Sequence, residues 1–255
     1  MIFESRQHVG RLLAEELKKR NVRPDLVYGL TRGGVVVAAE VAAAFKIPLT
    51  PLVVRKISPP ENSEFAVGAL AAPPDMEGSE PSVSVWWDKE VLRRLNLSDD
   101  WQKQQIKDKK IEILEYLHNL SFSEAGVSWR RQETPDNKNS RSVINLSNIV
   151  LVDDGAATGA TMMAAIGIIK TGVSWRCQET PDNNRIIVVL PVASSDAAAK
   201  IKHQADETII LDIDPDFRAV GQYYREFNQV SWDEVNALLQ LNNEAYRKTH
   251  SGELT

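Results

Sequence analysis

Two adjacent carboxylates, Asp153 and Asp154, follow the apolar run at residues 149–152 and precede a turn of small residues that carries the hydroxyls of Thr158 and Thr161. A continuous run of Ile, Val and Leu is typical of a buried strand, so the acids are expected at its C-terminal edge. A helix is expected to begin at the turn, and its free backbone amides could hold a phosphate together with the two hydroxyls. The carboxylates would repel that phosphate unless they face a sugar diol or a hydrated magnesium ion.

Three other kinds of protein site contain a segment similar to residues 149–161, and the sequence disfavours each of them. No Gly-Lys-Ser/Thr follows, as in a nucleoside-triphosphate loop, and there is no G-x-G-x-x-G for a dinucleotide. A receiver domain places its paired acids near its start, whereas two expected strands precede them here. A further alternative is a capped turn that binds no ligand. It is disfavoured because two adjacent acids at the end of a strand lower the stability of the fold unless something compensates their charge.

Two earlier segments could also bind an anion. Residues 31–34 (TRGG) follow the strand expected at 25–30, where glycines let backbone amides approach an anion and Arg32 adds a fork of donors. Arg55 and Lys56 begin an irregular run that we expect to be a mobile loop over 55–65. Taken alone, the first segment is a plain tight turn and the second a pair of solvated cations.

Residues 149–161 resemble the type I phosphoribosyltransferases, whose signature is an apolar strand, two acids and a T-G-x-T turn. Gly155 and Ala156 stand where that family usually has larger apolar residues. The order of the three segments agrees with the family. The sequence is also similar to a subgroup of small stand-alone bacterial proteins without an assigned substrate, through the segments RGGVVVAAEVA, VRKI, VDDGAATGA and PDFRAVGQYYREF.

The resemblance implies a role for each segment. Asp153 and Asp154 would bind the ribose hydroxyls of phosphoribosyl pyrophosphate (PRPP), with Asp153 also holding Mg2+ through water. The phosphate turn would bind the 5-phosphate, and the loop after the first strand would bind pyrophosphate. The residues are Ala156, Ala157, Thr158, Gly159, Ala160 and Thr161 for the 5-phosphate, Thr31, Arg32, Gly33 and Gly34 for the pyrophosphate, and Arg32 and Lys56 as catalytic groups.

The activity implied is transfer of the phosphoribosyl group to a nitrogenous, nucleobase-like acceptor with release of pyrophosphate. Family members that act on 6-oxopurines carry an acid where this sequence has Ala157, which argues against hypoxanthine and guanine. Phe217, Tyr223 and Tyr224 are candidates to stack on the acceptor, because a flat ring gains from aromatic contact. The alternative, that these three rings belong to the core, is at least as well supported.

A second class of function stays open: a non-catalytic sensor of PRPP or a nucleotide on the same fold. Retention of Arg32, Gly33, Gly34 and Lys56 favours the enzyme. No DNA-binding helix pair or basic face is recognisable, which disfavours a repressor.

The elements that must position these residues alternate along the chain. Strands are expected at 25–30, 48–54, 149–152, 186–190 and 208–211, and helices at 35–46, 159–170 and 194–203. Apolar strands separated by helices predict an α/β fold, a mostly parallel sheet with helices on both faces. Further helices are expected at 5–20, at 98–120 and from Ser231 to about Lys248, and a strand at 66–70.

We expect one phosphoribosyltransferase-like domain over 1–255, with an accessory segment at 71–120 and a C-terminal hood and helix at 213–255. Residues 126–137 and 172–183 form an internal repeat that differs only at Arg131 and Cys177. Nothing around the copies repeats, so we interpret them as two loop insertions.

Composition sets outer limits. The 255 residues are 43% hydrophobic and 25% charged, with a net charge of −5, close to the average for a soluble globular protein. One cysteine cannot form an internal disulfide, which suggests a cytoplasmic setting. No secretory signal or long apolar run occurs, so no membrane association is expected. A pI near 5.5 argues against bulk nucleic-acid binding. A homodimer remains an open expectation.

Overall fold

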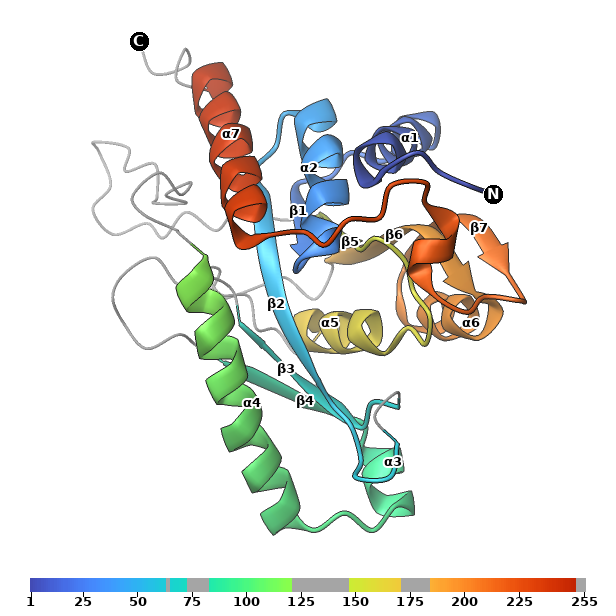
Figure 1. Ribbon diagram of the computed structural model, residues 1–255, viewed down its shortest axis with the longest axis vertical. Helices are drawn as coiled ribbons and strands as arrows, with labels where there is room; N and C mark the ends of the chain where they lie inside the picture. Colours follow the sequence, from blue (N-terminus) through green and yellow to red (C-terminus); the bar gives the residue numbers. More distant parts are fainter. Residues whose placement is uncertain (63–64, 73–82, 121–146, 171–183, 251–255) are drawn as a thin grey trace.

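The computed structural model of the chain describes residues 1–62, 65–72, 83–120, 147–170 and 184–250 (Figure 1). A seven-stranded sheet in the order β4-β3-β2-β1-β5-β6-β7 forms its centre. The strands are β1 (Leu26–Leu30), β2 (Leu49–Ile57), β3 (Gly68–Ala72), β4 (Ser84–Trp87), β5 (Asn148–Val152), β6 (Arg185–Ser194) and β7 (Glu207–Asp214). Strands β2, β1, β5, β6 and β7 are parallel, while β3 and β4 add an antiparallel edge.

Helices cover both faces of this sheet (Figure 1). The helices α1, α2 and α7 pack in one apolar cluster with one face of the strands, and α5 and α6 pack in a second cluster on the opposite face. The mostly parallel α/β fold is therefore confirmed. The helices are α1 (Arg6–Lys19), α2 (Gly33–Phe45), α3 (Lys89–Arg94), α4 (Asp99–Asn119), α5 (Ala160–Lys170), α6 (Ser195–Gln204) and α7 (Trp232–His250), with a 3-10 turn η1 (Val220–Tyr223).

The expected loop at 55–65 begins later than predicted. Arg55 and Lys56 lie inside β2, which continues to Ile57 and pairs antiparallel with β3 through Arg55 opposite Leu70 and Lys56 opposite Ala69. Pairing with β3 satisfies the backbone of these polar residues, which the polar composition of the run did not reveal. The predicted positions of both cations at the start of a loop were therefore wrong.

The segment expected to be accessory contains β4, α3 and α4. Ser98 caps α4, its Oγ accepting a hydrogen bond from the Trp101 amide at 3.2 Å. Helix α4 packs against β2 and β3. Strand β4 and helix α3 were not predicted.

The N-terminal residues pair with the segment between β7 and α7 beside the sheet. The Phe3 amide donates to the Tyr223 carbonyl at 2.7 Å, and the Arg225 amide donates to the Phe3 carbonyl at 2.9 Å. In Figure 1 the segment between β7 and α7 accordingly passes close to the start of α1. Ser231 caps α7 as expected, accepting from the Glu234 amide at 3.1 Å. Both repeat copies lie outside the described residues.

Candidate active site

The loop after β1 and the acids after β5 lie side by side at the C-terminal edge of the sheet. Strands β1 and β5 are parallel neighbours, with Gly29 opposite Val152. A Cβ atom at Gly34 would lie 2.9 Å from the Cα of Asp153, and one at Gly33 would collide with the carboxylate of Asp154. Only glycine permits this close approach. The structure thus brings together two predicted segments that are about 120 residues apart in the sequence.

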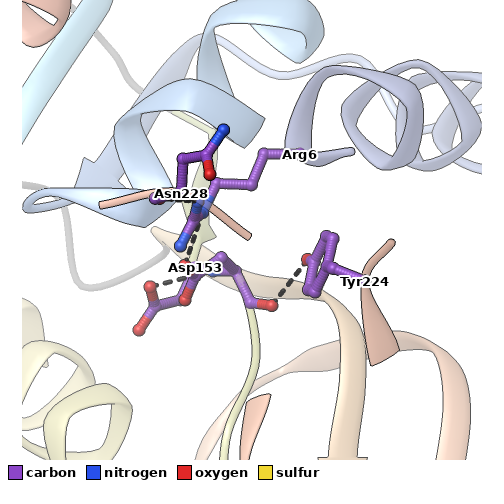
Figure 2. A network of polar contacts seen from close by, with 5 residues as sticks. Arg6, Asp153, Tyr224 and Asn228 are labelled. Carbon is purple, nitrogen blue, oxygen red and sulfur yellow. Dashed lines mark hydrogen bonds and ion pairs between the residues drawn. The ribbon is translucent and has the colours of Figure 1, made fainter. Parts of the chain in front are cut away.

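The two carboxylates have different partners (Figure 2). Asp153 accepts a hydrogen bond from the Asp154 amide at 2.9 Å through Oδ1. Asp154 Oδ2 is ion-paired with Arg6 Nε at 2.7 Å, and both side chains are largely buried, with 15% and 10% exposed respectively. Tyr224 donates its hydroxyl to the backbone carbonyl of Asp154 at 2.7 Å. Asp154 is therefore held at its side chain and at its backbone.

Burial and mutual repulsion disfavour ionisation of the pair. Desolvation, followed by the negative charge of Asp154, raises the pKa of Asp153 well above its usual range. Desolvation also raises the pKa of Asp154, and the Arg6 guanidinium opposes that rise. Arg6 thus favours the charged form at Asp154, while Asp153 is the carboxyl in the more costly environment.

The predicted phosphate turn, residues 156–161, is fixed against the end of β6. Ala156 donates its amide to the Val192 carbonyl at 3.0 Å and accepts from the Ser194 amide at 3.0 Å. Ser194 Oγ donates to the Ala157 carbonyl at 2.6 Å. Gly159 has a φ of 72°, in the left-handed region, and precedes α5 directly. The turn is therefore rigid on one side, with Ala157 exposed and Thr158 and Thr161 partly exposed beside the first turn of a helix.

A cavity of about 440 Å³ opens beside the loop after β1. Thr31, Arg32 and Gly33 form one part of its lining, so three predicted pyrophosphate residues face a cavity. The rest of the lining comes from three other elements, which contribute Arg6, Tyr116, Phe227, Asn228, Gln229 and Val230.

Two aromatic rings in contact lie between two arginines next to this cavity. The Arg32 guanidinium lies 5.6 Å from the ring of Trp232, whose ring meets Tyr116 edge-on at 5.0 Å between centroids. The central guanidinium carbon of Arg55 lies 3.5 Å from the centroid of the Tyr116 ring. Arg55 Nε is also 3.5 Å from a Glu112 carboxylate oxygen. Contacts between cations and ring faces of this kind are attractive. Arg55 is thereby held beside α4.

The aromatic residues predicted for the acceptor lie mostly inside the protein. Tyr223 and Tyr224 are 3% and 6% exposed and belong to the apolar core, and Phe217 stacks on Tyr223 at 5.0 Å. Burial, together with the hydrogen bond to Asp214, raises the pKa of Tyr223 to about 12. This packing favours the core interpretation that the sequence had left open. The rings at the cavity are those of Tyr116 and Phe227.

Six residues that line the cavity were missed by the sequence reasoning: Arg6, Tyr116, Phe227, Asn228, Gln229 and Val230. Arg6 opens α1, Tyr116 lies in α4, and the other four lie shortly before α7. Phe227 ends the PDFRAVGQYYREF segment. No motif marks any of the six as a cavity residue, because their proximity results from the packing of distant elements. Only the apolar periodicity of 5–20 pointed to a packed helix near Arg6.

The acid pair provides the type of ligand that magnesium prefers. Among the described residues no group of three or more His, Cys, Asp or Glu side chains could hold a metal ion. Magnesium usually keeps several waters and takes one or two carboxylates together with substrate oxygens, so two carboxylates at the sheet edge are compatible with it. In the same described ranges, no helix has the length and apolarity needed to cross a membrane.

Comparison with known proteins identifies related chains. A crystal structure of the protein TT1426 from Thermus thermophilus is 33% identical, with a TM-score of 0.69, and the match covers 94% of this chain and 99% of that one. Proteins named "Putative phosphoribosyl transferase" from two strains of Mycobacterium tuberculosis are 33% identical over 93% of this chain and 46% of their own. The chain thus spans about half the length of these curated relatives.

The family itself follows from a direct match. The family model of the phosphoribosyl transferase domain matches residues 2–174, about two thirds of the chain. That range includes α1, the loop after β1, β2 and the phosphate turn. The resemblance noted from residues 149–161 is confirmed, and the chain belongs to the phosphoribosyltransferase family.

Proposed function

We propose that this protein transfers the phosphoribosyl group of PRPP to a nitrogenous, nucleobase-like acceptor and releases pyrophosphate. The observation that carries the proposal is the contact of Gly33 and Gly34 with Asp154 and Asp153. It supports one continuous site in which a phosphate turn, two carboxylates and a glycine-rich anion loop adjoin. PRPP carries a phosphate, a diol and a pyrophosphate on one ribose, so its groups correspond to these three parts.

Each part has a role in the proposed reaction. The backbone and hydroxyls of residues 156–161 bind the 5-phosphate, and Asp153 and Asp154 accept hydrogen bonds from the ribose hydroxyls. Residues 31–34 bind the pyrophosphate through backbone amides and Arg32. Asp153 would hold Mg2+ through water, and the ion, when bound, neutralises charge on the pyrophosphate.

The chemistry is a substitution at the anomeric carbon. The bond from this carbon to the pyrophosphate oxygen breaks, a bond to the acceptor nitrogen forms, and the proton of that nitrogen leaves to solvent. Positive charge develops on the sugar, while negative charge grows on the leaving group, where Arg32 and, by resemblance to the family, Lys56 would stabilise it. The protein contributes by positioning the reactants and stabilising these charges.

We place the acceptor at the part of the cavity wall formed by Tyr116 and residues 227–230, leaving the part formed by residues 31–33 to the pyrophosphate. The cavity volume of about 440 Å³ lies in the range of small-molecule sites and suits a single heterocycle. Tyr116 and Phe227 supply aromatic surface, and Asn228 and Gln229 supply amide groups that can bond ring nitrogens or carbonyls. Ala157 disfavours a 6-oxopurine as the acceptor, by resemblance to the family.

The test is release of pyrophosphate from PRPP and Mg2+ across a panel of bases that contains adenine, uracil, hypoxanthine and guanine. We expect turnover with at least one base and a nucleotide product. PRPP binding without pyrophosphate release for any base would instead favour the sensor function. Absence of PRPP binding would refute both.

A further inference from the structure

We propose that Arg6 is a positioning residue of this site, which holds the Asp154 carboxylate and the cavity wall at Phe227 and Asn228 in a single arrangement. This inference rests on the proposed function, because it assigns to Arg6 an effect on the binding of PRPP. Arg6 acts through these neighbours and is the first residue of α1, outside the three segments that the sequence pointed to.

The contact with Asp154 is specific. Arg6 Nε donates to Asp154 Oδ2 at 2.7 Å, and the two side chains are only 10% and 15% exposed. A charge-assisted hydrogen bond in such a setting is screened little by water. A Cβ at Gly33 would lie 3.0 Å from Arg6 Nε, so the guanidinium also fits closely against the pyrophosphate loop. These contacts leave the Asp154 carboxylate little room to rotate.

The same guanidinium contacts the C-terminal segment. Arg6 Nη1 donates to the Asn228 carbonyl at 2.9 Å, and its central carbon lies 3.9 Å from the centroid of the Phe227 ring. Phe227 and Asn228 both line the cavity. One planar group therefore links the carboxylate expected to bind ribose with the wall expected to contact the acceptor.

The position of Arg6 is itself fixed. Ser5 caps α1, its Oγ accepting from the His8 amide at 3.2 Å, and Phe3 is hydrogen-bonded on both sides to the segment around Tyr223 and Arg225. Lysine could not replace Arg6, because an ammonium lacks the planar fork that serves a carboxylate, a carbonyl and a ring face at once.

Binding of PRPP with Mg2+, measured by titration calorimetry, tests the proposal. We expect Arg6→Ala to weaken PRPP binding at least about tenfold, the usual scale for losing a hydrogen bond to a charged group, and Arg6→Lys to recover only part of it. Millimolar guanidinium, far below denaturing concentrations, should restore binding to Arg6→Ala. Rescue of binding at an unchanged Tm would show that the loss lies at the site and not in the overall stability of the fold.

A double-mutant comparison checks that Arg6 acts through Asp154. In an Asp154→Asn background, Arg6→Ala should cause a smaller further loss of PRPP affinity than in the wild type, because the ion pair is already gone. The matched control is Arg11→Ala on the same helix, where a 58% exposed side chain pairs with Glu40 at 3.5 Å. This control should bind PRPP like the wild type.

The outcomes separate this inference from the proposed function. If the wild type binds no PRPP, the proposed function fails. If the wild type binds it and folded Arg6→Ala binds it equally well, the role of Arg6 is refuted. Should Arg6→Ala fail to fold, wild-type affinity in Arg6→Lys would refute it equally.

Discussion

Substitution of Gly33 by alanine should displace the acid pair. The added Cβ would collide with the Asp154 carboxylate and lie 3.0 Å from Arg6 Nε. Neither atom belongs to a mobile side chain, because the two groups are ion-paired at 2.7 Å in a largely buried position. Relieving the overlap requires a shift of roughly an ångström between the loop after β1 and Asp154, and misplacement on that scale can cost about 100-fold in rate.

Gly33→Ala should lower the free energy of unfolding only modestly, whereas it should lower kcat/KM strongly. Overpacking of this kind typically costs about 1–3 kcal/mol, so the variant should remain folded. The assay combines thermal unfolding with kcat/KM for PRPP, or with PRPP affinity by calorimetry if the acceptor is still unidentified. We expect a modest fall in Tm together with a loss of kcat/KM approaching 100-fold.

A second glycine provides the control. A Cβ at Gly68 would collide with the Trp87 ring, where β3 pairs with β4 and β2 separates both strands from β1. Gly68→Ala should therefore lower Tm without lowering the PRPP affinity of the folded protein. Wild-type kcat/KM in Gly33→Ala, or an equal loss in both variants, would contradict the reasoning.

Three further predictions follow from the site. Lys56→Ala should lower kcat far more than it weakens PRPP binding, because the cation is proposed to act on the departing pyrophosphate; unchanged steady-state turnover would count against that role. Asp153→Asn should raise Tm at neutral pH while weakening PRPP binding, because it removes a desolvated charge beside Asp154, and a lower Tm would contradict this cause. Tyr223→Phe should lower Tm near pH 7 by removing the 2.7 Å hydrogen bond to Asp214. That hydrogen bond lowers the pKa of Asp214 in the folded protein. The stability that the bond contributes is therefore present above the pKa of the unfolded state and is lost as the pH falls through the lower pKa of the folded state. A Tm difference between the variant and the wild type that persists in strong acid would contradict this prediction.

The parallel sheet could be predicted because its strands carry their own signal. The runs at 149–152 and 186–190 are continuous Ile, Val and Leu, and burial on both faces leaves no polar residue to obscure them. The antiparallel edge carries a weaker signal. Arg55 and Lys56 are polar residues within β2, and their strand conformation depends on pairing with β3.

Some residues of the candidate site could likewise be identified from the sequence and others could not. The acids, the phosphate turn and the glycines of residues 31–34 are local motifs and could be identified from the sequence. Arg6, Tyr116 and Phe227 could not, because tertiary packing alone brings α1, α4 and the segment before α7 to the cavity. The aromatic residues singled out at 223 and 224 sit beside this region, but their hydroxyls serve Asp214 and the Asp154 carbonyl in the core.

The most direct test of the central claim is a crystal structure of the protein with PRPP and Mg2+. We expect ribose hydroxyls within hydrogen-bond distance of Asp153 and Asp154, the 5-phosphate on residues 156–161 and the pyrophosphate on residues 31–34. PRPP bound elsewhere, or with its ribose turned away from the two carboxylates, would contradict it.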